Sequence, residues 1–532
     1  MDDVLIRGAE VIDGTGAPGR RIDVAVRDGR ISAVGTAERP ARRVIDAPGA
    51  VLAPGFIDIH THSDFTLPLN QRAESKIRQG VTTEVLGNCG FSVAPALPDR
   101  VELLRSYLAA SAPWLPFRPT TFGAYLDAFP TTSVNTVMQV GHNTLRLMAM
   151  GMGNRSPRAD ELALMERLLE EALDAGALGL SSGLFTAPGS YAQPEELLAL
   201  ARVLRRHGAN YASHVRNEAG HVFDAVDEAI NVAEACDIHV QIAHLKLSGT
   251  DNWGGASKLL ARIGEARRRG VRVDADQYPY TTASNPLRNL LPLWVQDGGL
   301  DAMLERLRDP AARERIRGDI AAHGWGSFGR LPSWDAVRIA ISPNHPESAG
   351  RTIGEIARRR SGDQLDAACD VLVADEGHTR VLLTSMSEDD VREILRSPTV
   401  LVGSDGIALA PYGVTGQGKP HPRFYGTFPR VLGHYVRELG LLSLPEAIRK
   451  MTGGSAAALG LAERGLIREG FWADLTLFNP KAVAERATYD DPHQYAAGIA
   501  TVIVNGVVVV DGGEHTGALP GRLLRRGSHG VE

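Results

Sequence analysis

The chain has 532 residues, a hydrophobic content of 43% and a formal net charge of −6, a composition typical of a globular protein with more than one structural unit. Because the chain is acidic and its lysines and arginines are scattered, it gains no electrostatic attraction to nucleic acid or to an anionic membrane, and we expect neither as a partner. No apolar stretch is long enough to cross a bilayer.

The first residues and the cysteines bear on the cellular compartment. The chain begins with acidic residues that run directly into a strand pattern, without the basic and apolar parts of a signal peptide. The three cysteines, Cys89, Cys236 and Cys369, are too few and too widely spaced for a disulfide framework. We therefore expect a cytoplasmic protein in which Cys89 is free to act as a ligand or a nucleophile.

The two ends of the chain share a pattern of short strands. Residues 4–51 contain strand-like runs with Asp28-Gly29 as a tight turn, and residues 473–512 repeat the pattern around Asn505-Gly506. We predict that the ends pair into one small β-sandwich domain, formed by residues 1–53 and 466–532.

The middle of the chain alternates strands with amphipathic helices. Ser156-Pro157 predicts a helix start, with the serine as cap and the proline in the first position, and Pro194 predicts a second start. Further strands and helices follow in turn: strands at 211–215, 239–245 and 271–278, and helices around 225–235 and 259–269. This order predicts an α/β fold with a parallel sheet.

The length of the alternating region favours a closed barrel. Over roughly 400 residues, repeated strand–helix units indicate a (β/α)8 TIM barrel, which we assign to residues 54–465. Residues 285–345 mix proline, tryptophan, glycine and charged helical segments, and we interpret them as an inserted subdomain over the active-site end. An open, doubly wound sheet is the structural alternative, but no G-x-G-x-x-G follows a strand as its nucleotide-binding form requires.

The strongest local motif is the segment from Phe56 to His62, which contains the pair His60 and His62. On a strand, residues two apart point to the same face, so the two imidazoles are expected to project together and to suit a divalent metal. An isolated H-x-H is weak evidence, because two histidines can share a strand for unrelated reasons.

Further ligand-type residues follow the ends of other predicted strands. A β-rich run ends in a turn that contains Cys89, and other strand patterns end in His214, His244 and Asp405. Any one of them taken alone is as readily a buried thiol, a cap or a turn residue. In TIM-barrel enzymes the active site lies at the carboxyl ends of the strands. Several strands that each end near a ligand-type residue therefore favour a metal site at that end of the barrel.

At this point the sequence resembles the amidohydrolase superfamily and, within it, the D-aminoacylase (N-acyl-D-amino-acid deacylase) group. The superfamily has an H-x-H on the first strand, single histidines on the fifth and sixth, and an aspartate on the eighth. The motifs that resemble the group extend over nearly the whole chain: GVTTEVLGNCGFS, SHVRNE, AHLKLSG, DQYPY, GSDG and HPRFYGTFPRVLGHY.

The resemblance implies a metal-ligand set. Related hydantoinases and dihydroorotases carry a bridging carbamylated lysine on the fourth strand, but the candidate fourth strand here, residues 177–183, has no lysine. The resemblance assigns the bridge to Cys89, a soft ligand that favours zinc. It implies one tight zinc site at Cys89, His214 and His244, and a second, weaker one at His60, His62 and Asp405.

The resemblance also implies a reaction and a substrate site. Zinc would activate water for attack on the amide of an N-acyl-D-amino acid, with Asp405 as general acid and base. Lys246, Tyr278, Ser284 and Arg423 match positions that bind the substrate carboxylate, although charged residues at such positions are often merely solvated. If the strand through His244 continues, Lys246 shares its face.

Three competing interpretations remain at the level of sequence. One is a cyclic amidase or isoaspartyl dipeptidase on the same scaffold, and another is a non-catalytic protein of amidohydrolase shape. A third is Cys89 as a nucleophile, for which the sequence offers no clear general base. The preferred side chain is also open: the leucines near residue 290 favour an apolar D-amino acid, whereas Arg288 favours an acidic one. The oligomeric state stays open as well.

Overall fold

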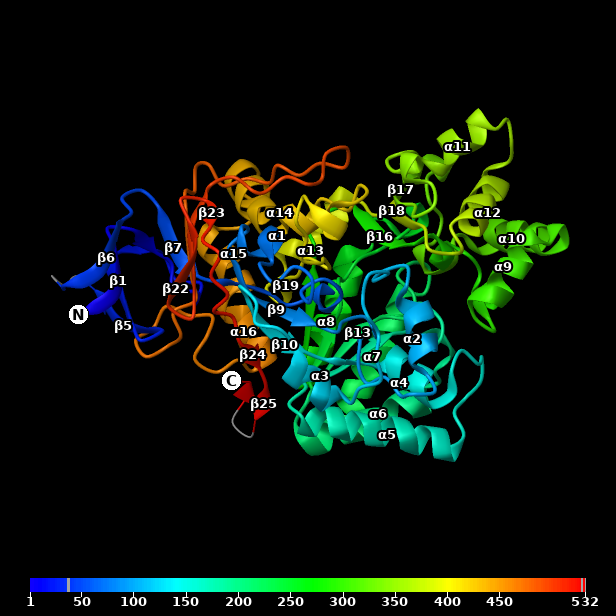
Figure 1. Ribbon diagram of the computed structural model, residues 1–532, viewed down its shortest axis with the longest axis horizontal. Helices are drawn as coiled ribbons and strands as arrows, with labels where there is room; N and C mark the ends of the chain where they lie inside the picture. The colour runs from blue at the N-terminus through cyan, green and yellow to red at the C-terminus, as the bar shows by residue number, and fades with distance from the viewer. Residues whose placement is uncertain (36–38, 528–529, 532) are drawn as a thin grey trace.

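The computed structural model describes residues 1–35, 39–527 and 530–531. Figure 1 shows the strands of both chain ends together on one side, the helix-rich middle of the chain beside them, and a helical lobe at the opposite end. The fold is mixed α/β. The helix-rich middle and the helical lobe together line the cavity that holds the candidate site.

Strands from the two chain ends form two sheets. One has the order β5-β4-β1-β6 and the other β23-β22-β21-β20-β7-β2-β3, in which β7 pairs antiparallel with β20. Apolar side chains from both sheets share one cluster, which includes Val4, Ile6, Leu52 and Leu477. The strands are β1 (Asp2–Arg7), β2 (Glu10–Val11), β3 (Arg20–Arg21), β4 (Asp23–Arg27), β5 (Arg30–Gly35), β6 (Ala41–Asp46), β7 (Val51–Pro54), β20 (Leu475–Phe478), β21 (Ile499–Val504), β22 (Val507–Asp511) and β23 (Glu514–His515).

Parallel strands form the centre of the molecule. They pair in the orders β8-β9-β10, with β24 on the outer side of β10, and β11-β12-β13-β14-β15-β19. Gln139 alone separates β10 from β11, and a parallel bridge between Thr61 and Gly406 joins the segments that follow β8 and β19. The strands are β8 (Phe56–Asp58), β9 (Val81–Leu86), β10 (Asn135–Met138), β11 (Val140–Gly141), β12 (Gly179–Gly183), β13 (Asn210–His214), β14 (Val240–Ile242), β15 (Val273–Gln277), β19 (Val400–Val402) and β24 (Leu523–Leu524).

Helices alternate with these strands, and their apolar faces are buried. The start predicted at Ser156-Pro157 is wrong: α5 begins at Ala159, because Glu161 accepts a hydrogen bond from the backbone N–H of Arg158 at 2.7 Å and so caps the helix there. The start predicted at Pro194 is confirmed. The helices are α1 (Glu74–Ile77), α2 (Val101–Leu108), α3 (Phe122–Ala128), α4 (His142–Met150), α5 (Ala159–Asp174), α6 (Pro194–His207), α7 (Val222–Cys236), α8 (Ala256–Arg268), α13 (Glu388–Arg396), α14 (Arg423–Arg430), α15 (Leu444–Met451) and α16 (Gly453–Leu459).

A separate lobe interrupts the alternation between β15 and β19. Its small antiparallel sheet has the order β16-β18-β17, and Figure 1 places its four helices at the end farthest from the terminal strands. The predicted insert at residues 285–345 lies within this region, whose sheet begins at Thr282 and ends at Thr384. Its elements are β16 (Thr282–Pro286), β17 (Val337–Ile341), β18 (Arg380–Thr384), α9 (Leu300–Arg308), α10 (Pro310–His323), α11 (Ile353–Arg359) and α12 (Gln364–Ala374).

Within the described part of the chain, no helix has the length and apolar character needed to cross a membrane. Cys89, Cys236 and Cys369 are all free thiols.

Candidate active site

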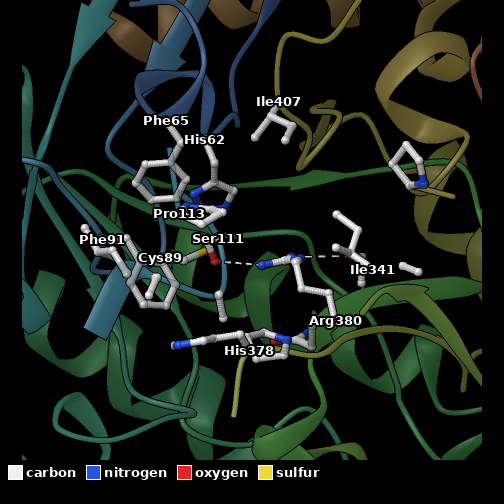
Figure 2. A pocket seen from close by; sticks show the side chains of 18 of the residues that line it. His62, Phe65, Cys89, Phe91, Ser111, Pro113, Ile341, His378, Arg380 and Ile407 are labelled. Atoms are coloured by element: carbon white, nitrogen blue, oxygen red, sulfur yellow. Dashed lines mark hydrogen bonds between the residues drawn. The ribbon is translucent and has the colours of Figure 1, made fainter. Parts of the chain in front are cut away.

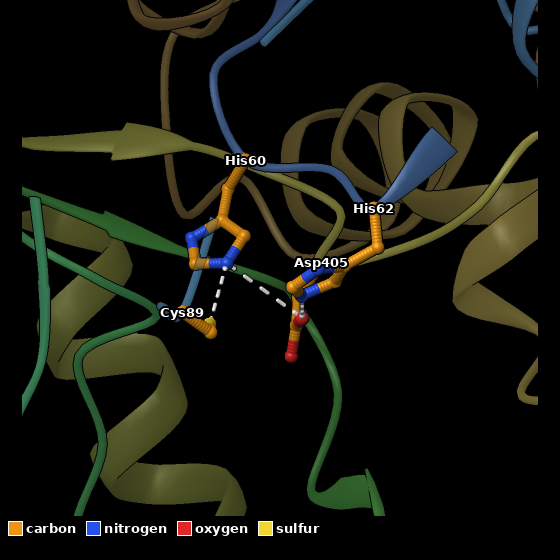
Figure 3. Close-up of side chains that lie close together, drawn as sticks. All are labelled: His60, His62, Cys89 and Asp405. Carbon is orange, nitrogen blue, oxygen red and sulfur yellow. Dashed lines mark hydrogen bonds and ion pairs between the residues drawn. The ribbon is translucent and has the colours of Figure 1, made fainter. Parts of the chain in front are cut away.

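The side chains of His60, His62, Cys89 and Asp405 converge at one point (Figure 3). Nε2 of His62 lies 3.2 Å from Oδ1 of Asp405, and Nε2 of His60 lies 3.7 Å from the same oxygen. The sequence therefore identified residues that meet in space.

The backbone conformation that brings His60 and His62 together differs from the expected strand. β8 ends at Asp58, so His60 and His62 do not lie on a strand, and the expectation of a shared strand face is wrong. Two hydrogen bonds instead hold this segment: the Thr61 N–H donates to the Val85 carbonyl at 3.0 Å, and the His62 N–H donates to the Gly406 carbonyl at 2.8 Å. Because these bonds tie the segment to β9 and to the chain after β19, both rings are directed toward Asp405.

Cys89 lies between two groups of candidate ligands. Its Sγ is 3.2 Å from Nε2 of His60 and 3.4 Å from Nε2 of His244. The ligand atoms of His60, His62, Cys89 and Asp405 lie within 4.8 Å of one another, and so do those of Cys89, His214 and His244. The thiol is thus the member that the two groups share.

The donor set suits a zinc ion. One thiol, four imidazoles and a carboxylate match the ligand types that zinc prefers. Nδ1 of the buried His214 and Nδ1 of His62 lack a hydrogen-bond partner within the described chain. Buried polar atoms are normally satisfied, so unpaired imidazole nitrogens beside a thiol indicate a ligand such as a metal ion.

The charges of the site favour the ligating forms of these groups. Burial opposes ionisation of the Cys89 thiol, but the neighbouring imidazoles of His60 and His244 hold its pKa well below the usual value. Burial likewise opposes ionisation of Asp405, yet the Arg423 guanidinium and the nearby imidazoles hold the pKa of this carboxyl well below its usual range. Nη2 of Arg423 lies 2.9 Å from Oδ2 of Asp405.

Three of the six candidate ligands have left-handed backbone conformations. The φ angles are +55° at Cys89, +35° at His244 and +47° at Asp405. A residue other than glycine in this region costs about 1–3 kcal/mol and persists only where the surrounding structure imposes it. All three follow the carboxyl ends of strands, and such strain is typical of functional sites.

The turn that presents Cys89 depends on Gly87. The φ angle of Gly87 is +74°, and a Cβ built there would lie 2.2 Å from the carbonyl oxygen of Gln139. Gly8 has a nearly identical φ of +76°, but a Cβ there would meet no atom within 4 Å. The two glycines therefore separate the effect of φ from that of the backbone clash.

We expect Gly87→Ala to lower Tm more than Gly8→Ala in thermal denaturation. The shared φ strain costs about 1–2 kcal/mol in each variant, and the clash adds about 1–3 kcal/mol at Gly87. Equal Tm values for the two variants would show that the turn before Cys89 relaxes freely and does not fix the position of the thiol.

Carboxylates that the sequence analysis missed hold the candidate ligands from behind. Asp276 lies 3.1 Å from Nδ1 of His60 and accepts a hydrogen bond from the His244 N–H at 2.9 Å. Glu218 Oε1 lies 3.1 Å from Nε2 of His214 and 3.2 Å from Nδ1 of His244. Carboxylates that face ligating histidines in this way fix the ring orientation and raise the basicity of the ring. Glu218 is the last residue of the SHVRNE motif and Asp276 the first residue of DQYPY, and these motifs were the available signal.

The four predicted substrate-binding residues occupy different positions. Ser284 and Arg423 line the cavity beside the candidate ligands, while the ring of Tyr278 stacks under the guanidinium of Arg423 at 4.4 Å. The strand expected at 239–245 ends at Ile242, so Lys246 does not share a strand face with His244. Nζ of Lys246 donates instead to Glu218 at 2.5 Å and contacts Nδ1 of His244 at 2.6 Å, behind the ligands.

The cavity opens above the candidate ligands and has two kinds of wall. Figure 2 shows aromatic side chains, Phe65 and Phe91 among them, on one side and Arg380 on another. Phe185 stacks on His214 with ring centroids 3.7 Å apart, which continues the aromatic wall to the ligands. Ser284 and Arg380 belong to β16 and β18, so the lobe between β15 and β19 supplies part of the wall.

Comparison with known proteins extends these observations to nearly the whole chain. An N-acyl-D-aspartate deacylase from Alcaligenes xylosoxydans xylosoxydans is 40% identical over 534 residues, which covers 99% of this chain and 95% of the relative. The crystal structure of N-acyl-D-glutamate deacylase from Bordetella bronchiseptica, with zinc and a phosphonate inhibitor that mimics the tetrahedral intermediate, superimposes with a TM-score of 0.82 at 37% identity, covering 98% of this chain and 99% of that one.

A third similar protein is a D-aminoacylase whose structure addresses its binuclear metal centre, activated by one metal and attenuated by a second. It superimposes with a TM-score of 0.83 at 37% identity and covers 99% of this chain and 100% of that one. The amidohydrolase family matches residues 43–510, the stretch that contains all the candidate ligands. The chain therefore belongs to the amidohydrolase family.

Proposed function

We propose that this protein is a zinc-dependent hydrolase that cleaves the amide bond of N-acyl-D-amino acids to give a carboxylate and a free D-amino acid. The observation that carries the proposal is the position of Cys89, which belongs to both ligand groups and lines the cavity. Relatives at 37–40% identity over nearly the full length are deacylases of N-acyl-D-amino acids.

The roles of the ligands follow from the two groups. Cys89, His214 and His244 would hold the tighter zinc ion, and His60, His62 and Asp405, with the shared Cys89, a second and weaker one. Zinc bound there supplies a Lewis acid that lowers the pKa of water and polarises the amide carbonyl. Glu218 and Asp276 keep the imidazoles of these groups in the orientation that ligation needs.

Asp405 acts as the general acid and base in this proposal. Its carboxylate lies at the cavity floor beside the ligands, where it accepts the proton of the attacking water. The same carboxylate then returns the proton to the nitrogen of the leaving amine, so no covalent intermediate with the protein is needed.

Arg423 and Tyr278 offer the donors that a substrate carboxylate requires. Nε and Nη1 of Arg423 and the hydroxyl of Tyr278 are buried and make no hydrogen bond among the described residues. Unpaired buried donors are costly, and a carboxylate accepts several such bonds at once. Ser284 adds a hydroxyl on the same cavity wall. Lys246, already paired with Glu218, would contribute a positive charge from behind His244.

The alternatives are less well supported. A cyclic amidase of the related type needs a bridging lysine on the fourth strand, and β12 contains none. A non-catalytic scaffold would be expected to have lost ligands, whereas all six candidates are present. The thiol of Cys89 has imidazole neighbours, yet a carboxylate and further imidazoles surround it as well, which favours ligation over attack.

We infer that the parallel strands close into an eight-stranded barrel over residues 54–465, since β10 and β11 are nearly continuous and the Thr61–Gly406 bridge joins the first and last members. Residues 1–53 and 466–532 would form the β-sandwich domain. Three free thiols, one of which serves as a ligand, fit a reducing cytoplasm.

Amine release from paired N-acetyl-D- and N-acetyl-L-amino acids tests the function. The substrates are the D and L forms of N-acetylmethionine, N-acetylleucine and N-acetylglutamate. With zinc-loaded protein, we expect hydrolysis of D substrates only, at kcat values in the ordinary range of about 1–10³ s⁻¹. Dihydrouracil and hydantoin are the matched cyclic amides. Zinc-loaded protein that hydrolyses these and leaves all D substrates intact is a cyclic amidase.

A further inference from the structure

A second cavity, which we call the lobe pocket, lies in the helical lobe and is separate from the candidate active site. It has a volume of about 150 Å³ and is bordered by α11, α12 and the 3-10 turn Pro346–Ser348, in the lobe at the end of the molecule farthest from the terminal strands (Figure 1). Because about 10–15 Å³ of such volume holds one water molecule, the lobe pocket has room for a small ligand. Its polar lining includes Ser342, Ser348, Arg351, Arg359 and Arg360.

The lobe pocket has more positive than negative charge on its wall. Arg351, Arg359 and Arg360 contribute three guanidinium groups, and Glu347 is the one carboxylate that the described residues add to the lining. Nη1 of Arg360 lies 3.8 Å from Oδ2 of Asp370. Within the described chain, no carboxylate lies within 4.0 Å of Arg351 or Arg359, and neither side chain makes a hydrogen bond. Two guanidinium groups of the lining are therefore without an acidic partner.

The hydroxyl of Ser342 distinguishes the lobe pocket from an ordinary charged surface. Arg359 is exposed, and exposed arginines are commonly solvated without any ligand. Ser342, by contrast, is only 3% exposed, and its Oγ is buried and makes no hydrogen bond among the described residues. Because Ser342 lines the lobe pocket, a ligand there with acceptor oxygens would satisfy a hydroxyl that is otherwise unfavourably unpaired.

The segment that carries Ser342 and Arg351 is held by backbone hydrogen bonds at both ends. The N–H of Asn344 donates to Oδ1 of Asp375, just after α12, at 3.0 Å. The N–H of Ile339 on β17 donates to the carbonyl oxygen of Arg351 at 2.8 Å. The wall of the lobe pocket is therefore fixed before any ligand binds, which lowers the entropic cost of binding.

The lobe pocket and the catalytic cavity lie on opposite sides of the chain after β17. Ile341 and Pro343 line the catalytic cavity, whereas Ser342 between them lines the lobe pocket. This alternation is expected because successive side chains of an extended segment point to opposite sides. No described residue lines both cavities, so a ligand in the lobe pocket does not occupy the substrate site.

We infer that the lobe pocket binds a phosphate-type oxyanion, either inorganic phosphate or the phosphate group of a small monoester. A phosphate monoester carries a charge of about −1.5 to −2 at pH 7, which matches the two unpaired guanidinium groups of Arg351 and Arg359. Its oxygens accept paired hydrogen bonds from an arginine and a further bond from the Ser342 hydroxyl, whereas a single carboxylate carries one charge only. The lobe pocket is then a ligand site that the proposed hydrolysis does not use.

Calorimetric titration of the zinc-loaded, dialysed protein tests the site. The two probes are inorganic phosphate and glycerol 3-phosphate, titrated at an ionic strength held constant with sodium chloride so that general screening does not contribute. We expect saturable binding of at least one probe to the lobe pocket. Tighter binding of inorganic phosphate identifies the free ion as the ligand, and tighter binding of glycerol 3-phosphate identifies a monoester.

Variants of the arginines distinguish the lobe pocket from the zinc ions, which also attract phosphate. Arg351→Gln should raise the Kd of the preferred probe at least about tenfold, because a hydrogen bond to a charged group contributes a factor of this order. Arg351→Lys should retain part of the affinity. Arg359→Gln should raise the same Kd and provides the test if Arg351→Gln does not fold, since Arg359 is exposed. Arg358→Gln is the matched control, because Arg358 precedes Arg359 on α11, pairs with Asp335 at 2.8 Å and does not line the pocket.

Either of two results would overturn the inference. One is the absence of saturable binding for both probes. The other is a Kd that Arg351→Gln and Arg359→Gln both leave unchanged, which would place the bound phosphate at the zinc ions of the candidate active site. Neither result depends on turnover of N-acyl-D-amino acids, so failure of the proposed function is a separate outcome.

Discussion

Asp405→Asn should lower kcat for N-acyl-D-amino acid hydrolysis by about 10²- to 10⁴-fold. Asparagine keeps the size of the side chain and an oxygen near His62, but it accepts no proton from water and delivers none to the amine. In the described chain, no other carboxylate lines the cavity, so no neighbour takes over this role. KM should change much less than kcat, because the groups proposed to bind the substrate remain in place.

The zinc content of each protein must be measured together with its rate. Zinc at Cys89, His214 and His244 does not involve Asp405, so the variant should retain at least that ion. Asp251→Asn is the control, since Asp251 is exposed and pairs with Arg330 at the surface. An Asp405→Asn enzyme with zinc bound and kcat within threefold of wild type would assign the proton transfer to another group.

Removal of the shared Cys89 thiol should lower activity by a similarly large factor, because it weakens zinc binding. In Cys89→Ala both candidate ligand groups lose a member at once, and the remaining imidazoles lose the negative charge that balances the metal. We expect zinc to fall well below one ion per chain after dialysis, and kcat/KM to fall by more than about 100-fold. Atomic absorption on the dialysed protein and assays with added zinc measure the two effects.

The other thiols provide the control for this variant. Cys236 lies at the end of α7, away from the cavity, and Cys236→Ala should leave both zinc content and rate unchanged. Excess zinc should restore part of the activity of Cys89→Ala if the thiol acts as a ligand. A variant with a full zinc complement and no activity would point to Cys89 as a nucleophile, with His60 or His244 as its base.

From the sequence alone it was possible to predict the residues that converge at the candidate site and the order of the strands and helices. The 3.6-residue period of the helices and the runs of apolar strand residues are local properties, so the sequence alone predicts the strand–helix alternation. The motifs around His60, Cys89 and Asp405 carried the family resemblance, because the ligand chemistry restricts residue type as well as spacing. The sequence misplaced the start of one helix. It predicted Pro157 as the first residue of this helix, but the helix begins at Ala159, where Glu161 caps it.

How these residues meet depends on the packing of distant segments and could not be predicted from the sequence. β8, β14 and β19 end before their ligand-type residues, and left-handed φ values at His244 and Asp405 replace the strand geometry that the pattern predicted. Cys89 lies in a turn, as predicted, with a left-handed φ that the sequence did not indicate. The sequence did not predict Arg380 as a cavity residue. Arg380 reaches the cavity because β18 pairs with β16, a strand almost a hundred residues earlier in the chain. Periodicity encodes which face of an element is buried, whereas the position of a side chain in a cavity depends on contacts between segments hundreds of residues apart, and these contacts arise only when the chain folds.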